Sequence, residues 1–103
     1  MKFFDFGQNN SGGSFTGPST YVVVEAENAA DANKRVLDVD GVYFDGCDAG
    51  LDCSCCGDRW YRQWETEVGD DVPSVYGQPV VFGDGGDVLV LYSDGTQKWG
   101  REN

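Results

Sequence analysis

The feature that most constrains the fold is the apolar run at residues 21–26, Tyr-Val-Val-Val-Glu-Ala. The run is β-branched and short enough for a strand, and its near-continuous apolar character predicts a central strand covered on both faces. A chain of 103 residues is long enough for one compact domain with a modest core. We therefore expect a single domain, residues 1–103, built in layers around this strand.

A helix is expected directly after the strand, at residues 29–37. Asn28 is a plausible N-cap, and Asp31 lies in the first turn, where a carboxylate suits the helix dipole. The expected apolar face consists of Ala29, Ala32 and Val36, with Leu37 at its border. Residues 42–44 predict the next strand, so that residues 21–44 would form a strand, helix, strand unit.

Five further segments predict strands. Residues 3–6 are aromatic, residues 60–67 alternate in the manner of a strand, and residues 80–82 follow a polar connection at 69–79. A hairpin is expected within residues 87–99, where residues 88–92 and 96–99 flank Ser93-Asp94-Gly95, because Asp-Gly supplies the positive φ angles of a tight turn. These elements predict an α+β fold: a mainly antiparallel sheet of four to six strands, one helix packed on it, and a cysteine-rich metal loop.

The net charge and the absence of histidine exclude several classes of function. The chain has 18 acidic and 7 basic residues, a net charge of −11 and no histidine. Without histidine the Ser-His-Asp triad and the Cys-His dyad are excluded, so we expect a binding protein and not an enzyme. Strong acidity disfavours phosphate backbones, so we expect a protein partner with a basic surface and no direct contact with nucleic acid.

The acidity is concentrated in the middle third. Residues 38–71 hold ten acids and two bases, which contribute −8 of the net −11. A face that docks onto a basic partner is one interpretation; a solvated face that keeps the chain soluble and an adaptation to high salt are two others. The candidate partner-binding residues are Asp38, Asp40, Asp45, Asp48 and Asp52.

A cluster of cysteines lies in this acidic stretch, within a loop expected at residues 45–59. Cys47, Cys53, Cys55 and Cys56 match the ligand count of a closed, structural zinc site. The spacing is unusual, so one thiol could be replaced by a nearby aspartate, and free or disulfide-bonded thiols or a redox or iron-sulfur centre remain alternatives. We expect structural zinc.

The run at residues 52–61, Asp-Cys-Ser-Cys-Cys-Gly-Asp-Arg-Trp-Tyr, preceded by residues 41–46, resembles a segment of small, uncharacterised proteins encoded by tailed bacteriophages. This resemblance covers about a quarter of the chain. It implies a viral accessory protein that acts in the host cytoplasm, and it implies nothing about catalytic residues.

Trp60, Arg62 and Trp64 share one face of the strand expected at residues 60–67. They could stack on a planar ligand such as a nucleotide-like signal, or they could be core aromatics with an arginine stem between them. The glycine-rich segment at residues 83–87 lacks the lysine of a phosphate loop and the final glutamate of a calcium loop, and predicts only a turn.

The first residues contain Asp5 within their only apolar run, so neither a secretory signal nor a membrane span is expected there. The prediction is thus an accessory protein of the host cytoplasm that inhibits or redirects a host defence or nucleic-acid-handling protein through its acidic face. Alternatives are a small-ligand binder, a structural protein of the virion, and an enzyme that uses carboxylates with a metal.

Overall fold

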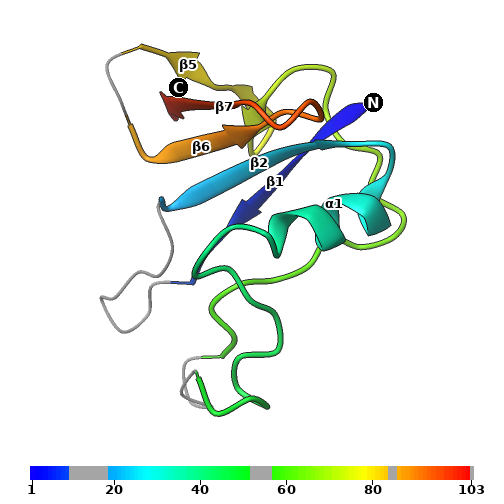
Figure 1. Ribbon diagram of the computed structural model, residues 1–103, viewed down its shortest axis with the longest axis vertical. Helices are drawn as coiled ribbons and strands as arrows, with labels where there is room; N and C mark the ends of the chain where they lie inside the picture. The colour runs from blue at the N-terminus through cyan, green and yellow to red at the C-terminus, as the bar shows by residue number, and fades with distance from the viewer. Residues whose placement is uncertain (10–18, 52–56, 84–85, 103) are drawn as a thin grey trace.

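The computed structural model describes residues 1–9, 19–51, 57–83 and 86–102. Its main sheet has five strands in the order β1-β2-β6-β7-β5 (Figure 1). The strands of this sheet are β1 (Lys2–Gly7), β2 (Tyr21–Ala26), β5 (Val81–Phe82), β6 (Val88–Leu91) and β7 (Gln97–Arg101). One helix, α1 (Ala29–Val36), and a two-stranded sheet of β3 (Ser74–Val75) and β4 (Gln78–Pro79) complete the elements. The expected α+β class is confirmed.

Strand β2 lies inside the sheet, as its apolar run predicts. It pairs antiparallel with β1 and parallel with β6, and Val22, Val23 and Val24 are fully buried. The other neighbours, β6 with β7 and β7 with β5, are antiparallel. The sheet is therefore mainly antiparallel, with one parallel pair whose two strands are joined through α1 and the long segment after it.

Side chains of the sheet alternate between two hydrophobic clusters. On the helix side, Phe4, Phe6, Val22 and Val24 pack with Trp60 and the apolar face of α1. On the opposite side, a smaller cluster is built under the β3–β4 hairpin from Phe3, Val23, Val75, Val80, Val88 and Val90. The period of two along each strand assigns neighbouring residues to opposite layers.

Helix α1 begins where the sequence predicts. The Asn28 side chain accepts a hydrogen bond from the Asp31 N–H at 2.8 Å, and Ala29, Ala32 and Val36 are the buried face. The helix ends at Val36, one residue earlier than expected, and Leu37 is the exposed C-cap. Local capping chemistry thus set the start of the helix.

The strand expected at residues 42–44 is wrong. Val42 is buried in the helix-side cluster, but the segment is irregular. The Val42 N–H donates a hydrogen bond to the Val39 carbonyl at 3.1 Å, as in a turn. Both edges of β2 are already taken, by β1 and β6, so no sheet edge is available beside it. The parallel partner of β2 is β6, far along the chain, and the compact unit at residues 21–44 does not form.

The strand expected at residues 60–67 is also wrong as a continuous element. The chain runs beside β1 but joins it at two isolated bridges, Gln8 with Trp60 and Phe3 with Asp70. Between them, the Gln63 side chain donates a hydrogen bond to the Asp5 carbonyl, so a side chain replaces the backbone ladder. Trp60 is buried, but the side chains at residues 61–67 are exposed or half-buried without a period of two, so the alternation in the sequence does not correspond to the two faces of a strand.

The C-terminal hairpin of β6 and β7 is confirmed. Its loop is Ser93-Asp94-Gly95, the Gly95 N–H bonds to the Tyr92 carbonyl at 3.0 Å, and only Gly95, at φ 90°, has the positive φ expected for the Asp-Gly pair. The short strand expected at residues 80–82 is β5. The polar connection at residues 69–79 contains a hairpin that the sequence analysis missed, β3–β4, whose two-residue loop places Tyr76 and Gly77 at positive φ.

Candidate binding groove

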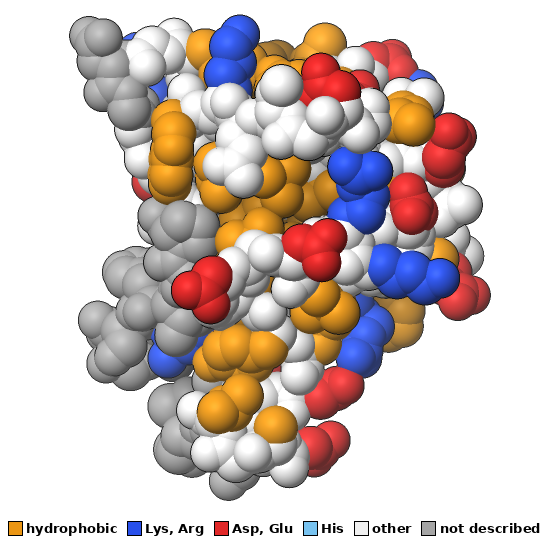
Figure 2. All heavy atoms as spheres, viewed as in Figure 1, with side chains coloured by type: hydrophobic (Ala, Val, Ile, Leu, Met, Phe, Trp, Pro, Cys, Tyr) orange, Lys and Arg blue, Asp and Glu red, His pale blue; other side chains and the backbone are white. Residues whose placement is uncertain are grey.

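A groove of about 740 Å³ lies between the C-terminal end of α1 and the strands β6 and β7. Its floor is mainly apolar and is formed by Leu89, Leu91 and Trp99 together with the polar Gln97, and the turn after α1 forms the opposite wall. Trp99 is 40 % exposed although it belongs to the sheet. In Figure 2 hydrophobic side chains are visible in the hollow of this face, with charged side chains along its edges.

The groove exists because the helix layer is narrower than the sheet. A helix about 10 Å across covers roughly two strands spaced about 4.8 Å apart. Figure 1 shows α1 over the β1 and β2 side of the sheet, with β6, β7 and β5 extending beyond it. On the helix-side face, Leu89 of β6 is buried in the helix-side cluster, whereas Gln97 and Trp99 of β7 are exposed, so the face of β7 remains open next to α1.

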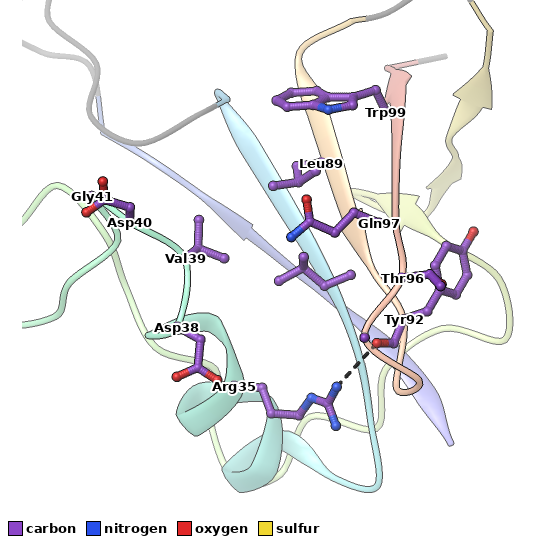
Figure 3. Close-up of a pocket in the computed structure, with 12 residues that line it drawn as sticks. Arg35, Asp38, Val39, Asp40, Gly41, Leu89, Tyr92, Thr96, Gln97 and Trp99 are labelled. Atoms are coloured by element: carbon purple, nitrogen blue, oxygen red, sulfur yellow. Dashed lines mark hydrogen bonds between the residues drawn. The ribbon is translucent and has the colours of Figure 1, made fainter.

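Asp38 and Asp40 line this groove (Figure 3). They lie on a turn and not on a strand, because Val39 between them is buried and its N–H bonds to the Val36 carbonyl at 3.0 Å. Gly41, at φ 87°, lets the chain reverse after them. The two exposed carboxylates are thus held on one wall, and in Figure 3 that of Asp38 points away from the strands.

Arg35 is the cation of this lining. Its guanidinium Nη2 donates a hydrogen bond to the Tyr92 carbonyl at 3.3 Å, across one end of the groove (Figure 3). The contact ties α1 to the end of β6 and uses part of the donor capacity of the arginine. The groove therefore combines an apolar floor, one tethered arginine and two exposed aspartates.

Two other predicted partner-binding residues, Asp45 and Asp48, are separate from the groove. Asp45 is bound by Arg62 at 2.6 and 3.2 Å, and the hydrogen bond from this guanidinium holds the pKa of the Asp45 carboxyl below its usual range. Asp48 is exposed on the turn at residues 46–50. Asp52 lies outside the described residues. Of the four members of this set that the structure describes, it therefore brings only Asp38 and Asp40 to the groove.

The three candidate stacking residues do not form a ladder. Trp60 is 1 % exposed and belongs to the helix-side core, whereas Trp64 is 78 % exposed. The Arg62 guanidinium lies 5.1 Å from the centre of the Phe44 ring. The core interpretation holds for Trp60, while Arg62 and Trp64 are on the surface beside it.

The structure describes only one of the four predicted zinc ligands, Cys47. Cys47 is half-buried, and its N–H donates a hydrogen bond to the Asp58 carboxylate at 2.9 Å, while Cys53, Cys55 and Cys56 lie outside the described residues. Within residues 1–9, 19–51, 57–83 and 86–102, no three His, Cys, Asp or Glu side chains gather closely enough to hold a metal ion. Structural zinc stays a prediction from the sequence.

The sequence profile of a family described as a domain of unknown function, DUF7296, matches residues 1–103. The chain belongs to the DUF7296 family. No curated protein and no solved structure matched it. In the part of this DUF7296 chain that the structure describes, no helix is long and apolar enough to cross a membrane.

The sequence of this DUF7296 chain predicted only part of the lining of the groove. The acids at residues 38 and 40 were identified from the local charge, but Leu89 and Trp99 were assigned to the hairpin and not to a site. Their register could have suggested it, since Leu89 lies opposite Trp99 across β6 and β7 and the two side chains share one face. What the sequence could not supply is that α1 stops short of this face.

Proposed function

We propose that this protein is a non-catalytic binding protein that holds a basic segment of a partner protein in the groove between α1 and the β6–β7 strands. The observation that carries the proposal is the exposed Trp99 on an apolar floor, facing a wall that holds Asp38 and Asp40. Tryptophan in such a position is a typical affinity anchor at protein interfaces. The carboxylates select a basic partner and accelerate encounter.

The resemblance to proteins of tailed bacteriophages supports a viral accessory protein in the host cytoplasm. On this basis the partner is a host protein with a basic surface, of the kind that defends the cell or handles nucleic acid. The net charge of −11 supports this choice, because it favours proteins that carry Lys-rich or Arg-rich surfaces and repels nucleic acid itself.

The test uses three baits of the full chain: wild type and two charge-matched variants, the double variant Asp38→Lys/Asp40→Lys and the control Glu65→Lys/Glu67→Lys. Both variants change the net charge equally, and Glu65 and Glu67 are exposed residues outside the groove. Each bait is incubated with host lysate at several salt concentrations. We expect wild type and control to retain the same basic protein, with release by salt, and the groove variant to lose it.

The variant Trp99→Ala separates the groove from charge in general. We expect it to weaken binding to the purified partner by at least tenfold while the salt dependence persists, since the charges remain. The proposal is wrong if the groove variant binds the same protein with the same salt midpoint as wild type. It is equally wrong if Glu65→Lys/Glu67→Lys loses binding to the same extent.

A further inference from the structure

A second cavity, of about 550 Å³, lies at the N-terminal half of α1, away from the groove, and we call it the Trp64 pocket. It is bounded by Ala30 and Asn33 of α1 on one side and by the segment at residues 58–65 on the other. Four of its lining side chains are aromatic: Phe44, Trp60, Tyr61 and Trp64. The volume is in the range that holds small molecules in proteins.

The backbone beside Trp64 is fixed by polar contacts from two elements. The Asn33 side chain accepts a hydrogen bond from the Gln63 N–H at 2.7 Å and donates one to the Gln63 carbonyl at 3.0 Å. The Gln63 side chain in turn reaches the Asp5 carbonyl of β1. Trp64 follows directly, so its indole projects into solvent from an anchored position.

Two of the exposed large apolar side chains of this structure, Tyr61 and Trp64, line the Trp64 pocket. Trp64 is 78 % exposed and Tyr61 is 56 % exposed, on either side of the anchored Gln63 segment. The fixed backbone at Gln63 therefore places Tyr61 and Trp64 where a ligand can contact their aromatic faces.

The charges of the pocket decide which ligand fits. Arg62 is the basic residue of the lining, and both of its terminal nitrogens are bound to the Asp45 carboxylate. This pair is neutral as a unit, so Asp58 and Glu65 leave the lining with net negative charge. Aromatic faces also carry negative potential. A phosphate group would have to displace Asp45 from Arg62 and approach two further carboxylates, whereas a cation would meet none of these obstacles.

We propose that the Trp64 pocket binds a small organic cation of the quaternary or alkylated ammonium class, with Tyr61 and Trp64 against its methyl groups and Glu65 beside its charge. Cation–π contacts of this kind favour tryptophan and strengthen when the cation is partly removed from water. The site is distinct from the groove between α1 and β6–β7, so it stands or falls independently of the proposed function.

The test is a titration of the full chain by calorimetry and by the indole N–H signals of the three tryptophans in NMR spectra. The probes are choline, its neutral isostere 3,3-dimethyl-1-butanol, and adenosine monophosphate. We expect choline to bind saturably and to shift the Trp64 signal, the neutral isostere to bind at least tenfold more weakly, and the nucleotide not to compete.

Matched variants locate the effect. Trp64→Ala should lower choline affinity at least tenfold, and Glu65→Gln severalfold, because they remove the aromatic face and the charge. Trp99→Ala, in the groove, should leave the affinity unchanged. Absence of saturable choline binding, equal binding of the neutral isostere, competition by the nucleotide, or an equal loss in Trp99→Ala would each overturn the proposal. The exposed position of Trp64 makes its truncation compatible with folding, which the remaining indole signals report.

Discussion

At the scale of single residues, Asn33 links α1 to the irregular segment at residues 60–67. It is a half-buried helix residue whose amide satisfies both backbone groups of Gln63. In Asn33→Ala two backbone groups lose their partners, so we expect the free energy of unfolding to fall by about 1–3 kcal/mol. Urea denaturation measures this. The neighbouring variant Lys34→Ala, at an exposed position, should change it by less than about 0.5 kcal/mol, and equal effects of the two variants would contradict the role given to Asn33.

Asp70 is a residue whose charge opposes folding. Partial burial raises the pKa of its carboxyl, and repulsion by Asp5, Asp71 and Glu67 adds to the shift. A carboxyl whose folded pKa lies above its unfolded pKa lowers stability when it is ionised, and this cost disappears as the pH falls through the folded pKa and below the unfolded one. We therefore expect Asp70→Asn to stabilise the protein at pH 7, by less than about 1 kcal/mol because solvent screens the group.

The pH dependence distinguishes this cause from a change in packing. The gain from Asp70→Asn should shrink as the pH falls from 7 towards the acidic range, as urea denaturation at each pH would report. The adjacent variant Asp71→Asn should act in the opposite direction at pH 7, because a hydrogen bond from Lys2 lowers the pKa of Asp71. A gain from Asp70→Asn that is independent of pH would contradict an electrostatic origin.

At the scale of elements, the strength of local signals decided what the sequence could predict. The buried run of β2, the Asn28 cap and the Asp-Gly turn each act within a few residues, and the structure has all three elements where they were expected. The segments at residues 42–44 and 60–67 have strand-like sequences, but whether they pair depends on which sheet edges are open. That depends on β6, whose pairing with β2 joins residues more than sixty positions apart.

The pairing of β7 with β5 depends on the absence of a side chain at Gly100. A Cβ atom built there would lie 2.4 Å from Val80 Cγ1 and 3.0 Å from the Val81 carbonyl oxygen. We expect Gly100→Ala to cost about 1–3 kcal/mol of unfolding free energy, as overpacking does. In a Val80→Ala background the clashing methyl group is gone, so the same change should cost less. Additive losses in this double-mutant cycle, measured by urea denaturation, would show that the two residues do not interact.

For the cysteine segment, the prediction of structural zinc rests on the number of thiol ligands and not on local geometry. If Cys47, Cys53, Cys55 and Cys56 hold structural zinc, protein purified without chelators should contain about one zinc per chain by elemental analysis. Cys47→Ser should then lower zinc content and thermal stability together, whereas Asp48→Ser, one residue on, should change neither. Metal-free protein with four thiols that react freely would contradict the zinc site.

At the scale of the whole molecule, the layers around the sheet are unequal. In the described part of the chain one short helix covers part of one face and the β3–β4 hairpin covers part of the other. The mainly antiparallel sheet of five strands is thus left with an open helix-side face over β7, where Trp99 is exposed, next to the buried Leu89 of β6. The described part of the acidic middle third, residues 38–51 and 57–71, is irregular and consists of the turns after α1 and the segment that runs beside β1 (Figure 1). The groove and the Trp64 pocket both lie where these acidic segments border the sheet or α1.

The net charge of −11 makes self-repulsion a property of the whole fold. Salt screens exposed charges over about 8–10 Å at physiological ionic strength, so raising NaCl from 10 to 300 mM at pH 7 should increase the melting temperature, by on the order of 5 °C. The increase should fade near the isoelectric point of about 4.1, where the net charge vanishes. Glu65→Lys/Glu67→Lys, with four fewer net negative charges, should melt higher than wild type at 10 mM salt and respond less to added salt. A melting temperature that is insensitive to salt at pH 7, followed by circular dichroism, would mean that favourable ion pairs already balance the repulsion.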